Sequence, residues 1–224
     1  MPTLYHCLSA RSFRPLWTLE ELGLPYTLHV LPFPPRVLAR DYLQINALGT
    51  VPAFIDGPLC MTESVAICQY LVDRHAATPL AVRPAEPDYG RYLNWLYFGE
   101  ATLTFPQTLV LRYERLEPAA QRNPQVASDY RRWFLARLRA VEAVVGDGVL
   151  CAGRFTLADI SVGYALLLAQ YLGLSADFPP AVQAYWSGLQ QRPSFVRAVA
   201  AELAAAAAQG VDTDIARIFL PREA

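Results

Sequence analysis

The stretch that decides the fold is residues 51–72, VPAFIDGPLCMTESVAICQYLV, in which a hairpin pattern runs directly into a helical pattern. Residues 51–55 and 59–61 are short apolar runs on either side of Asp56-Gly57-Pro58, a turn sequence that predicts a β-hairpin. From Ser64 onward, apolar residues recur at helical spacing until just before His75. The stretch therefore predicts two paired strands followed by a helix.

Strand and helix patterns alternate before this stretch, and the elements they predict cover residues 3–7, 11–22, 26–31 and 37–44. In the first helix Ser12 suits the N-cap, and Gly23 suits the left-handed position that ends a helix. The predicted order is β-α-β, a crossover, then β-β-α. This order corresponds to a small mixed sheet with helices on its faces.

A proline-rich segment follows, since residues 79–87 contain three prolines, and it predicts a linker between domains 1–78 and 88–224. The second domain is all-helical, with helices expected over residues 88–117 (bent near Pro106), 126–145, 156–173, 181–191 and 194–208. Thr156 and Asp159 form the capping-box pattern, so we interpret Asp159 as structural.

Charge and hydropathy exclude several classes of protein. The chain has 224 residues, 54% of them hydrophobic, with 19 basic and 20 acidic side chains, and every basic residue is arginine. A nucleic-acid binder needs excess positive charge and a disordered chain needs low hydrophobicity, so neither class fits. We therefore expect no nucleic-acid partner. The lack of lysine also excludes Schiff-base chemistry.

The four cysteines are scattered and lack both a C-x-x-C pair and nearby histidines; they are Cys7, Cys60, Cys68 and Cys151. This spacing predicts neither a metal site nor a disulfide framework. The first residues show no signal-peptide pattern, and no apolar run is long enough to span a bilayer. We expect a cytoplasmic protein with reduced thiols and no membrane partner.

Four motifs in chain order resemble those of the cytosolic glutathione transferase family. They are Leu19-Glu-Glu-Leu-Gly-Leu-Pro-Tyr26, Asn46-Ala-Leu-Gly-Thr-Val-Pro52, Met61-Thr-Glu-Ser-Val-Ala-Ile67 and Phe155-Thr-Leu-Ala-Asp-Ile160. The resemblance covers nearly the whole chain and is closest to serine-type, zeta- or nu-like members. It implies an α/β thioredoxin-like N-terminal domain that binds glutathione, an all-α C-terminal domain that holds a second substrate, and a homodimer.

The resemblance also implies a binding site for the glutathione peptide. A cis Val51-Pro52 peptide would turn the backbone of Val51 outward, where it could pair with glutathione as an added strand. Glu63 and Ser64, at the start of a helix, would bind the ammonium and carboxylate of the γ-glutamyl group. The simpler interpretations are an ordinary turn proline for Pro52, and an N-cap with a first-turn acid for Ser64 and Glu63.

By the same resemblance, the residue that binds the glutathione sulfur lies between the first strand and the first helix. Ser9 is the first candidate, Ser12 the second, and Arg11 could stabilise a thiolate by its charge. A hydrogen bond to the sulfur lowers the pKa of the thiol. Tyr5 occupies a position that is catalytic in some classes, but we interpret it as a strand residue, and Cys7 as a packed thiol. The isolated His6, His29 and His75 receive no catalytic role.

Many family members have a lysine where this chain has Thr50. Any charge pairing with the glycine carboxylate of glutathione must then come from an arginine, for which Arg40, Arg36 and Arg11 are the candidates. The alternative is that hydroxyl groups and water bind this carboxylate without a charged partner. Candidates for the second-substrate site are Trp95, Phe98, Thr102, Phe105, Arg112 and Tyr113, with residues 212–220 as a possible lid.

The predicted function is a glutathione transferase that activates the glutathione thiolate for attack on a small electrophile, as in detoxification. Glutathione serves as co-substrate and no metal is expected. A glutathione-dependent disulfide or peroxide reductase or isomerase is the first alternative, and a non-catalytic binding protein on the same fold is the second.

Overall fold

The computed structural model describes residues 1–74 and 78–214, and its contacts divide the chain into two compact units. The first unit combines Met1–Ala81 with the segment that begins at Gln190, and the second contains Val82–Leu189. The linker predicted over residues 79–87, and with it the division into domains 1–78 and 88–224, stays a prediction.

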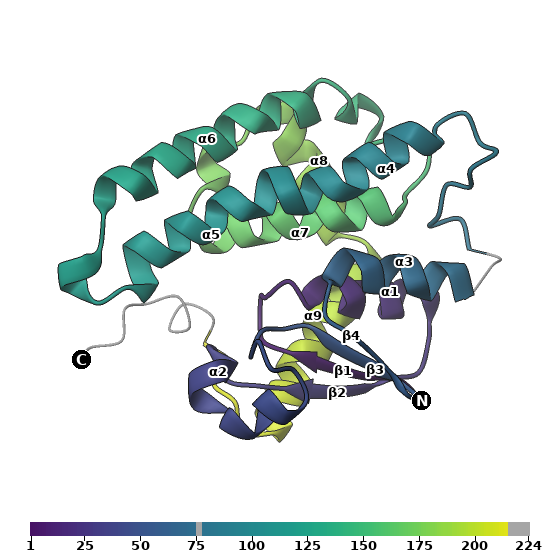
Figure 1. The fold of residues 1–224 in the computed structure, drawn as a ribbon. Coiled ribbons are helices and arrows are strands. Elements are labelled where there is room, and N and C mark those ends of the chain that lie inside the picture. Colours follow the sequence, from purple (N-terminus) through teal and green to yellow (C-terminus); the bar gives the residue numbers. More distant parts are fainter. Residues whose placement is uncertain (75–77, 215–224) are drawn as a thin grey trace. The chain divides into compact units, whose positions relative to one another are not determined.

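A four-stranded mixed sheet lies at the centre of the first unit (Figure 1). Its strands are β1 (Thr3–His6), β2 (Thr27–Val30), β3 (Ala53–Asp56) and β4 (Leu59–Met61), in the order β2-β1-β3-β4. The strand β1 is parallel to β2 and antiparallel to β3, while β3 and β4 form an antiparallel hairpin. The hairpin and the mixed sheet that the sequence predicts are therefore confirmed.

The helices of the first unit are α1 (Phe13–Leu22), α2 (Pro35–Leu38), α3 (Ser64–Arg74) and α9 (Pro193–Ala208), with a 3₁₀ turn at Arg40–Gln44. Gly23 ends α1 with φ of +64°, as predicted, because glycine adopts the left-handed conformation without a steric penalty. Although α9 follows the helical segment in sequence, it packs on α1 and β2. The ring of Phe195 lies edge-on to Phe13 and Trp17, and Trp17 Nε1 donates to Ser194 Oγ at 3.0 Å.

The second unit is helical. Its α-helices are α4 (Tyr89–Tyr97), α5 (Phe105–Leu111), α6 (Pro124–Glu142), α7 (Leu157–Tyr171) and α8 (Pro180–Gln190). Short 3₁₀ turns cover Ala119–Gln121, Val145–Asp147 and Ser175–Asp177. The long helix expected over 88–117 is interrupted by π-helical segments at Phe98–Thr104 and Arg112–Leu116. Pro106 follows the first of them and has no N–H to donate to the preceding turn, which favours an irregular hydrogen-bond pattern there.

The helix α7 forms the core of the second unit, and its side chains are buried from Leu157 to Ala169. Thr156 and Asp159 form the predicted capping box at its start. Where α7 meets the π segment, a Cβ on Gly99 would lie 2.4 Å from Ser161 Oγ, so this crossing requires glycine. Ser161 Oγ donates to the Leu96 carbonyl at 2.7 Å, and this hydrogen bond stabilises the same helix crossing.

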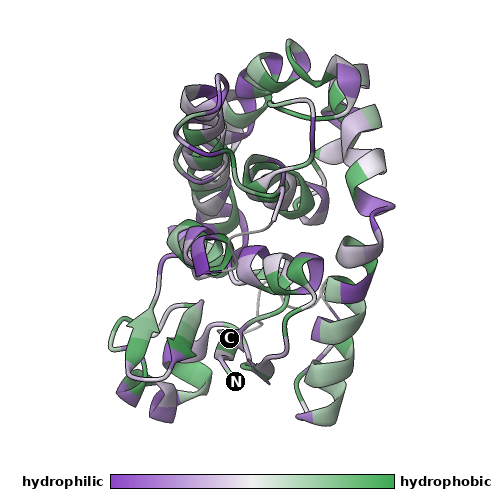
Figure 2. Cartoon of the chain, turned by 90° about the vertical axis from the view of Figure 1, so that its right-hand side faces the viewer, coloured by the Kyte–Doolittle hydropathy of each residue, from purple (hydrophilic) through white to green (hydrophobic). Residues whose placement is uncertain are grey.

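Hydrophobic and hydrophilic residues alternate in bands along the helices (Figure 2), the pattern of helices that bury one face. Within residues 1–74 and 78–214, every helix is either too short or too polar to cross a membrane.

Candidate functional site

Three segments that carry predicted site residues meet at one end of the sheet. Tyr5 in β1 lies opposite Ala53 in the antiparallel β3, so β1 leaves the sheet where β3 enters it. Phe54 lies opposite Met61, so β4 leaves the sheet at the same end. The loop after β1, the segment before β3 and the start of α3 are therefore neighbours.

The loop after β1 is tightly folded around Ser9 and Ser12, which are both buried. Ser9 has φ of +59°, a left-handed conformation that side chains other than glycine adopt rarely and at a cost of about 1 kcal/mol or more. The hydroxyl of Ser12 accepts a hydrogen bond from the Cys7 N–H at 3.4 Å. Ser12 occupies the N-cap position of α1, as predicted, but its backbone is helical and its side chain caps no N–H of that helix. Arg11, in the same loop, is half-buried.

The segment before β3 is organised by Asn46. Its side-chain amide donates to the Thr50 carbonyl at 2.8 Å, and its oxygen accepts from the Leu48 N–H at 3.1 Å. Tyr42 also donates to the Thr50 carbonyl, at 2.7 Å. Gly49 has φ of +59°, and a Cβ there would lie 2.6 Å from the Cβ of Arg36. These contacts explain why this loop contains asparagine and glycine at these two positions.

The loop ends in a cis peptide between Val51 and Pro52, which confirms the isomer that the resemblance implies. Val51 lies before the first residue of β3, so it is outside the ladder that joins β3 to β1 and β4. In the part of the chain that the structure describes, no backbone group pairs with the N–H or C=O of Val51. Both groups are therefore available to an extended peptide.

Ser64 begins α3 and is buried, whereas the preceding Glu63 is exposed. Arg14 of α1 donates from Nη1 to Ser64 Oγ at 3.2 Å, and the side chain of Arg14 is fully buried. A guanidinium can only donate, so Ser64 Oγ accepts from it and keeps its own hydroxyl hydrogen for another acceptor. The positive charge of Arg14 adds to that of the α3 N-terminus, which favours an anion in front of Ser64.

Arg14 is a residue that the sequence interpretation missed. The sequence feature that could have identified Arg14 is its place as a charged residue in an otherwise apolar stretch. Its neighbours Phe13 and Pro15-Leu16-Trp17 are all buried. An arginine in such a stretch is buried only if other groups accept its hydrogen bonds.

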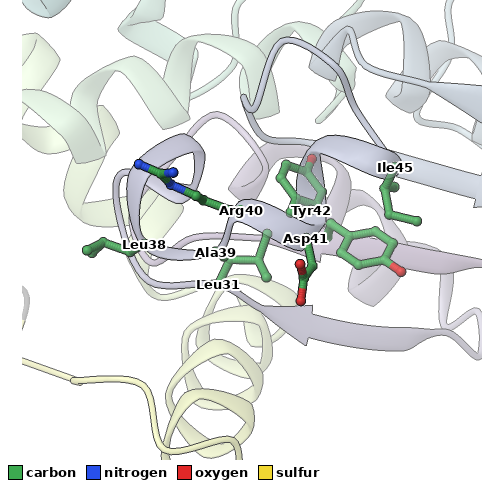
Figure 3. Close-up of a pocket in the computed structure, with 8 residues that line it drawn as sticks. Leu31, Leu38, Ala39, Arg40, Asp41, Tyr42 and Ile45 are labelled. Atoms are coloured by element: carbon green, nitrogen blue, oxygen red, sulfur yellow. The ribbon is translucent and has the colours of Figure 1, made fainter.

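Arg40 lies in a pocket of about 570 Å³, which is also lined by Tyr5, Leu31, Leu38, Ala39, Asp41, Tyr42 and Ile45 (Figure 3). Its guanidinium points away from the ring of Tyr42 (Figure 3). Arg40 and Arg36 are both exposed. The role of either in binding the glycine carboxylate stays a prediction.

Residues 2–73 match the family model described as glutathione S-transferase, N-terminal domain. Over 201 residues the chain is 30% identical to glutathione S-transferase hmp2 of Hypomyces subiculosus, an alignment that covers 84% of this chain and 92% of that relative. The chain belongs to the glutathione S-transferase family. The predicted family is thereby confirmed.

Solved structures agree with this assignment. A glutathione transferase from Methylococcus capsulatus str. bath has a TM-score of 0.79 at 27% identity, covering 90% of this chain and 98% of that one. The transferase URE2P6 of Phanerochaete chrysosporium, solved with oxidized glutathione, has a TM-score of 0.78 at 27% identity, covering 91% and 97%. The predicted thioredoxin-like sheet with a helical C-terminal part is confirmed.

The candidates for the second-substrate site lie in different surroundings. Trp95 is buried against Phe98, with ring centroids 4.9 Å apart. Phe98 and Thr102 line a pocket of about 460 Å³ in the second unit. Phe105 is exposed, Arg112 pairs with Glu117 at 2.6 Å, and the Arg112 guanidinium lies 5.4 Å from the ring centre of Tyr113. Of the possible lid, residues 215–220 lie outside the described residues.

Two of the three histidines have defined neighbours. Tyr5 stacks on His29 with centroids 5.0 Å apart, which agrees with its interpretation as a strand residue. His6 is buried and contacts Glu202 of α9 at 2.8 Å. His75 lies outside the described residues. Glu202 is a second residue that the sequence interpretation missed, because it lies in an alanine-rich helix far along the chain.

The cysteines differ sharply in exposure, and this predicts their reactivity. Cys7, Cys68 and Cys151 are buried and Cys60 is exposed. Burial raises the pKa of Cys7 well above its usual range, that of Cys68 to about 12 and that of Cys151 to about 11. Since the thiolate is the reactive form, a disulfide reagent at neutral pH should titrate Cys60 alone in the native protein, and all four thiols after unfolding.

A Cys60→Ser variant is the control for this labelling and should show almost no rapid reaction in the native state. Native labelling of two or more thiols at similar rates would contradict the burial described here.

Proposed function

We propose that this protein is a glutathione transferase that binds glutathione in its first unit and activates the thiol for attack on a small electrophile. The observation that carries the proposal is that, among the described residues, no backbone group pairs with the N–H or C=O of Val51, which lies beside the start of α3. The cysteinyl backbone of glutathione would pair with Val51 as an added strand.

In this proposal the γ-glutamyl carboxylate binds at the N-terminus of α3, where the Ser64 hydroxyl donates to it. Arg14, which donates to Ser64 Oγ, adds positive charge to this site. Glu63, exposed beside Ser64, accepts from the γ-glutamyl ammonium. The glycine carboxylate would pair with an arginine such as Arg40, because the chain has no lysine and Thr50 precedes Val51.

The hydroxyl of Ser9 is proposed to donate to the glutathione sulfur and to favour its thiolate. The thiol S–H bond breaks and its proton leaves to solvent. The sulfur then forms a bond to the electrophilic carbon, and the leaving group departs with its bonding electrons. Ser12 is the second candidate for this role and Arg11 the third. The reaction as proposed needs no metal or organic redox cofactor.

Isothermal titration calorimetry with reduced glutathione tests the binding step, and heat of binding saturating at millimolar concentration or below is expected. An assay panel with an aryl halide, a hydroperoxide and a mixed disulfide then separates transferase from reductase activity. Turnover of the aryl halide is expected to dominate, because Cys7, the thiol next to the loop that carries Ser9, is buried and its pKa is raised. No heat with glutathione would contradict both enzyme functions and favour a non-catalytic protein.

We also propose that the protein is a cytoplasmic homodimer that acts in detoxification. Light scattering after size exclusion should give twice the chain mass of 24.9 kDa. A mass equal to a single chain would contradict the dimer alone.

Replacing Arg14 with methionine should weaken glutathione binding about tenfold, because one charge-assisted contribution to the carboxylate site is lost. An analogue of glutathione that lacks the α-carboxylate of the γ-glutamyl group should bind the wild type and Arg14→Met equally. Calorimetry with both ligands measures this difference.

The matched control is Arg74→Gln, which removes an exposed arginine of α3 that lies far along the helix from Ser64. It should leave the affinity for both ligands unchanged. An equal loss of affinity for both ligands in Arg14→Met would mean that Arg14 only stabilises the fold.

A further inference from the structure

A fully buried histidine and a fully buried glutamate meet between the sheet and the last helix of the first unit. His6 Nε2 lies 2.8 Å from Glu202 Oε2, and neither side chain is exposed. His6 is the last residue of β1, and Glu202 lies in the middle of α9. Taking two ionisable groups out of water is costly, so the pair needs a physical explanation.

The same carboxylate oxygen also reaches the loop that carries Ser9. The N–H of Ser9 donates to Glu202 Oε2 at 3.4 Å. One oxygen of α9 therefore accepts from both the end of β1 and the residue two positions beyond Cys7. Because Ser9 is left-handed, its N–H has no place in a strand ladder and depends on an acceptor of this kind.

The docking of α9 does not depend on this carboxylate. Phe195 packs on Phe13 and Trp17, and the Arg197 guanidinium donates to Glu20 Oε2 at 3.0 Å. Gln209, just beyond α9, accepts from the Val30 N–H at 2.9 Å and donates to the Leu28 carbonyl at 2.9 Å.

The buried residues on either side of Glu202 along this face of α9 are alanines, Ala198 and Ala206. An apolar residue at 202 would suit such a face at least as well as a glutamate hydrogen-bonded to His6. In the described part of the chain, His6 Nδ1 and Glu202 Oε1 have no hydrogen-bond partner, which adds to the cost of the pair.

We propose that Glu202 is a positioning residue for the loop after β1, which carries Ser9. The carboxylate of Glu202, oriented by His6, accepts from the Ser9 N–H and so keeps Ser9 in its left-handed conformation. That conformation directs the Ser9 hydroxyl toward the glutathione sulfur. A residue of the C-terminal helix thereby sets the pKa of the glutathione thiol. This inference rests on the proposed function only in the role of Ser9, since the contact between Glu202 and the loop is independent of it.

The test compares three variants. Glu202→Gln keeps the shape and weakens the acceptor, and His6→Leu/Glu202→Met replaces the pair with apolar residues of similar size, which keeps α9 packed. Arg197→Gln is the matched control, because it weakens a different contact between α9 and α1 and leaves the loop untouched. Thermal melting establishes that each variant is folded.

Two measurements are expected to change in the Glu202 variants and not in Arg197→Gln. Hydrogen exchange of the Ser9 amide, followed by NMR without ligand, should accelerate about tenfold or more while amides within α1 keep their protection. The pKa of the thiol of bound glutathione, read from its ultraviolet thiolate absorbance, should rise by about one unit, and kcat should fall in proportion. The dissociation constant for glutathione should stay within about twofold of the wild-type value.

Unchanged exchange of the Ser9 amide in the double variant would overturn the proposal, and so would an equal effect of Arg197→Gln. If the wild-type protein bound no glutathione, the proposed function would fail, while amide exchange would still decide whether Glu202 holds the loop. If exchange accelerates in a glutathione-binding protein and the thiol pKa stays constant, Glu202 is a structural residue only, and the proposal is wrong.

Discussion

Replacing Ser9 with alanine is expected to lower the kcat for an aryl halide about a hundredfold at neutral pH while glutathione still binds. The proposed donor to the thiolate is lost, so the pKa of the bound thiol should rise by about two units and the thiolate fraction should fall in parallel. Ultraviolet absorbance of the thiolate, titrated against pH in the complex, measures the shift directly.

The left-handed backbone of Ser9 supplies a matched variant. Ser9→Gly also removes the hydroxyl, but glycine adopts φ of +59° without strain, so it should be more stable than Ser9→Ala by about 1 kcal/mol. Both variants should show the same rise in thiol pKa if the hydroxyl is what matters. A rise in the alanine variant alone would trace the effect to the backbone.

Ser12→Ala separates the two serine candidates. The Ser12 hydroxyl accepts from the Cys7 N–H inside a buried loop, so its removal should cost about 1 kcal/mol of stability and leave the thiol pKa unchanged. If the Ser9 variants titrate like the wild type, the role passes to Ser12 or Arg11.

Replacing Asp159 with alanine is expected to destabilise the protein by about 3–5 kcal/mol, a loss of the size measured when a buried charged partner is removed. The carboxylate is fully buried and accepts from the Thr156 N–H at 2.8 Å and the Leu150 N–H at 3.0 Å. The Tyr185 hydroxyl also donates to it at 2.8 Å. Alanine would leave all these donors without a partner.

Chemical unfolding followed by circular dichroism measures this loss. Asp159→Asn keeps the shape and one acceptor oxygen, so it should lose about half as much stability as Asp159→Ala. The folded fraction of either variant should turn over substrate normally. Normal stability with lost turnover would contradict the structural interpretation and make Asp159 a catalytic acid.

The features that could be predicted from the sequence depend on residues close together in the chain. The Asp56-Gly57-Pro58 turn specified the hairpin, Gly23 the end of α1, and Thr156 with Asp159 the start of α7. The cis peptide before Pro52 followed from the resemblance of a seven-residue motif. Residues so close in sequence meet in almost any fold that contains the element.

The predictions that went wrong or fell short involve competition between local and distant partners. Ser12 takes the predicted N-cap position, but its hydroxyl caps no N–H of α1 and accepts from the Cys7 N–H instead, because the loop folds back on itself. The helix expected over 88–117 contains two π segments, at the first of which Gly99 packs against Ser161 of α7. Helical periodicity alone carries no information about either contact.

Short stretches of sequence are enough to predict the order of the elements, the hairpin and the helix ends, and the resemblance adds the family. The hydrogen-bond partners of the candidate site residues become known only from the folded structure. Arg14 reaches Ser64 across 50 positions, and Glu202 reaches His6 across 196. Contacts over such separations depend on the strand register and on where α9 packs, and these are set by the burial of the whole apolar surface of the unit rather than by any short pattern.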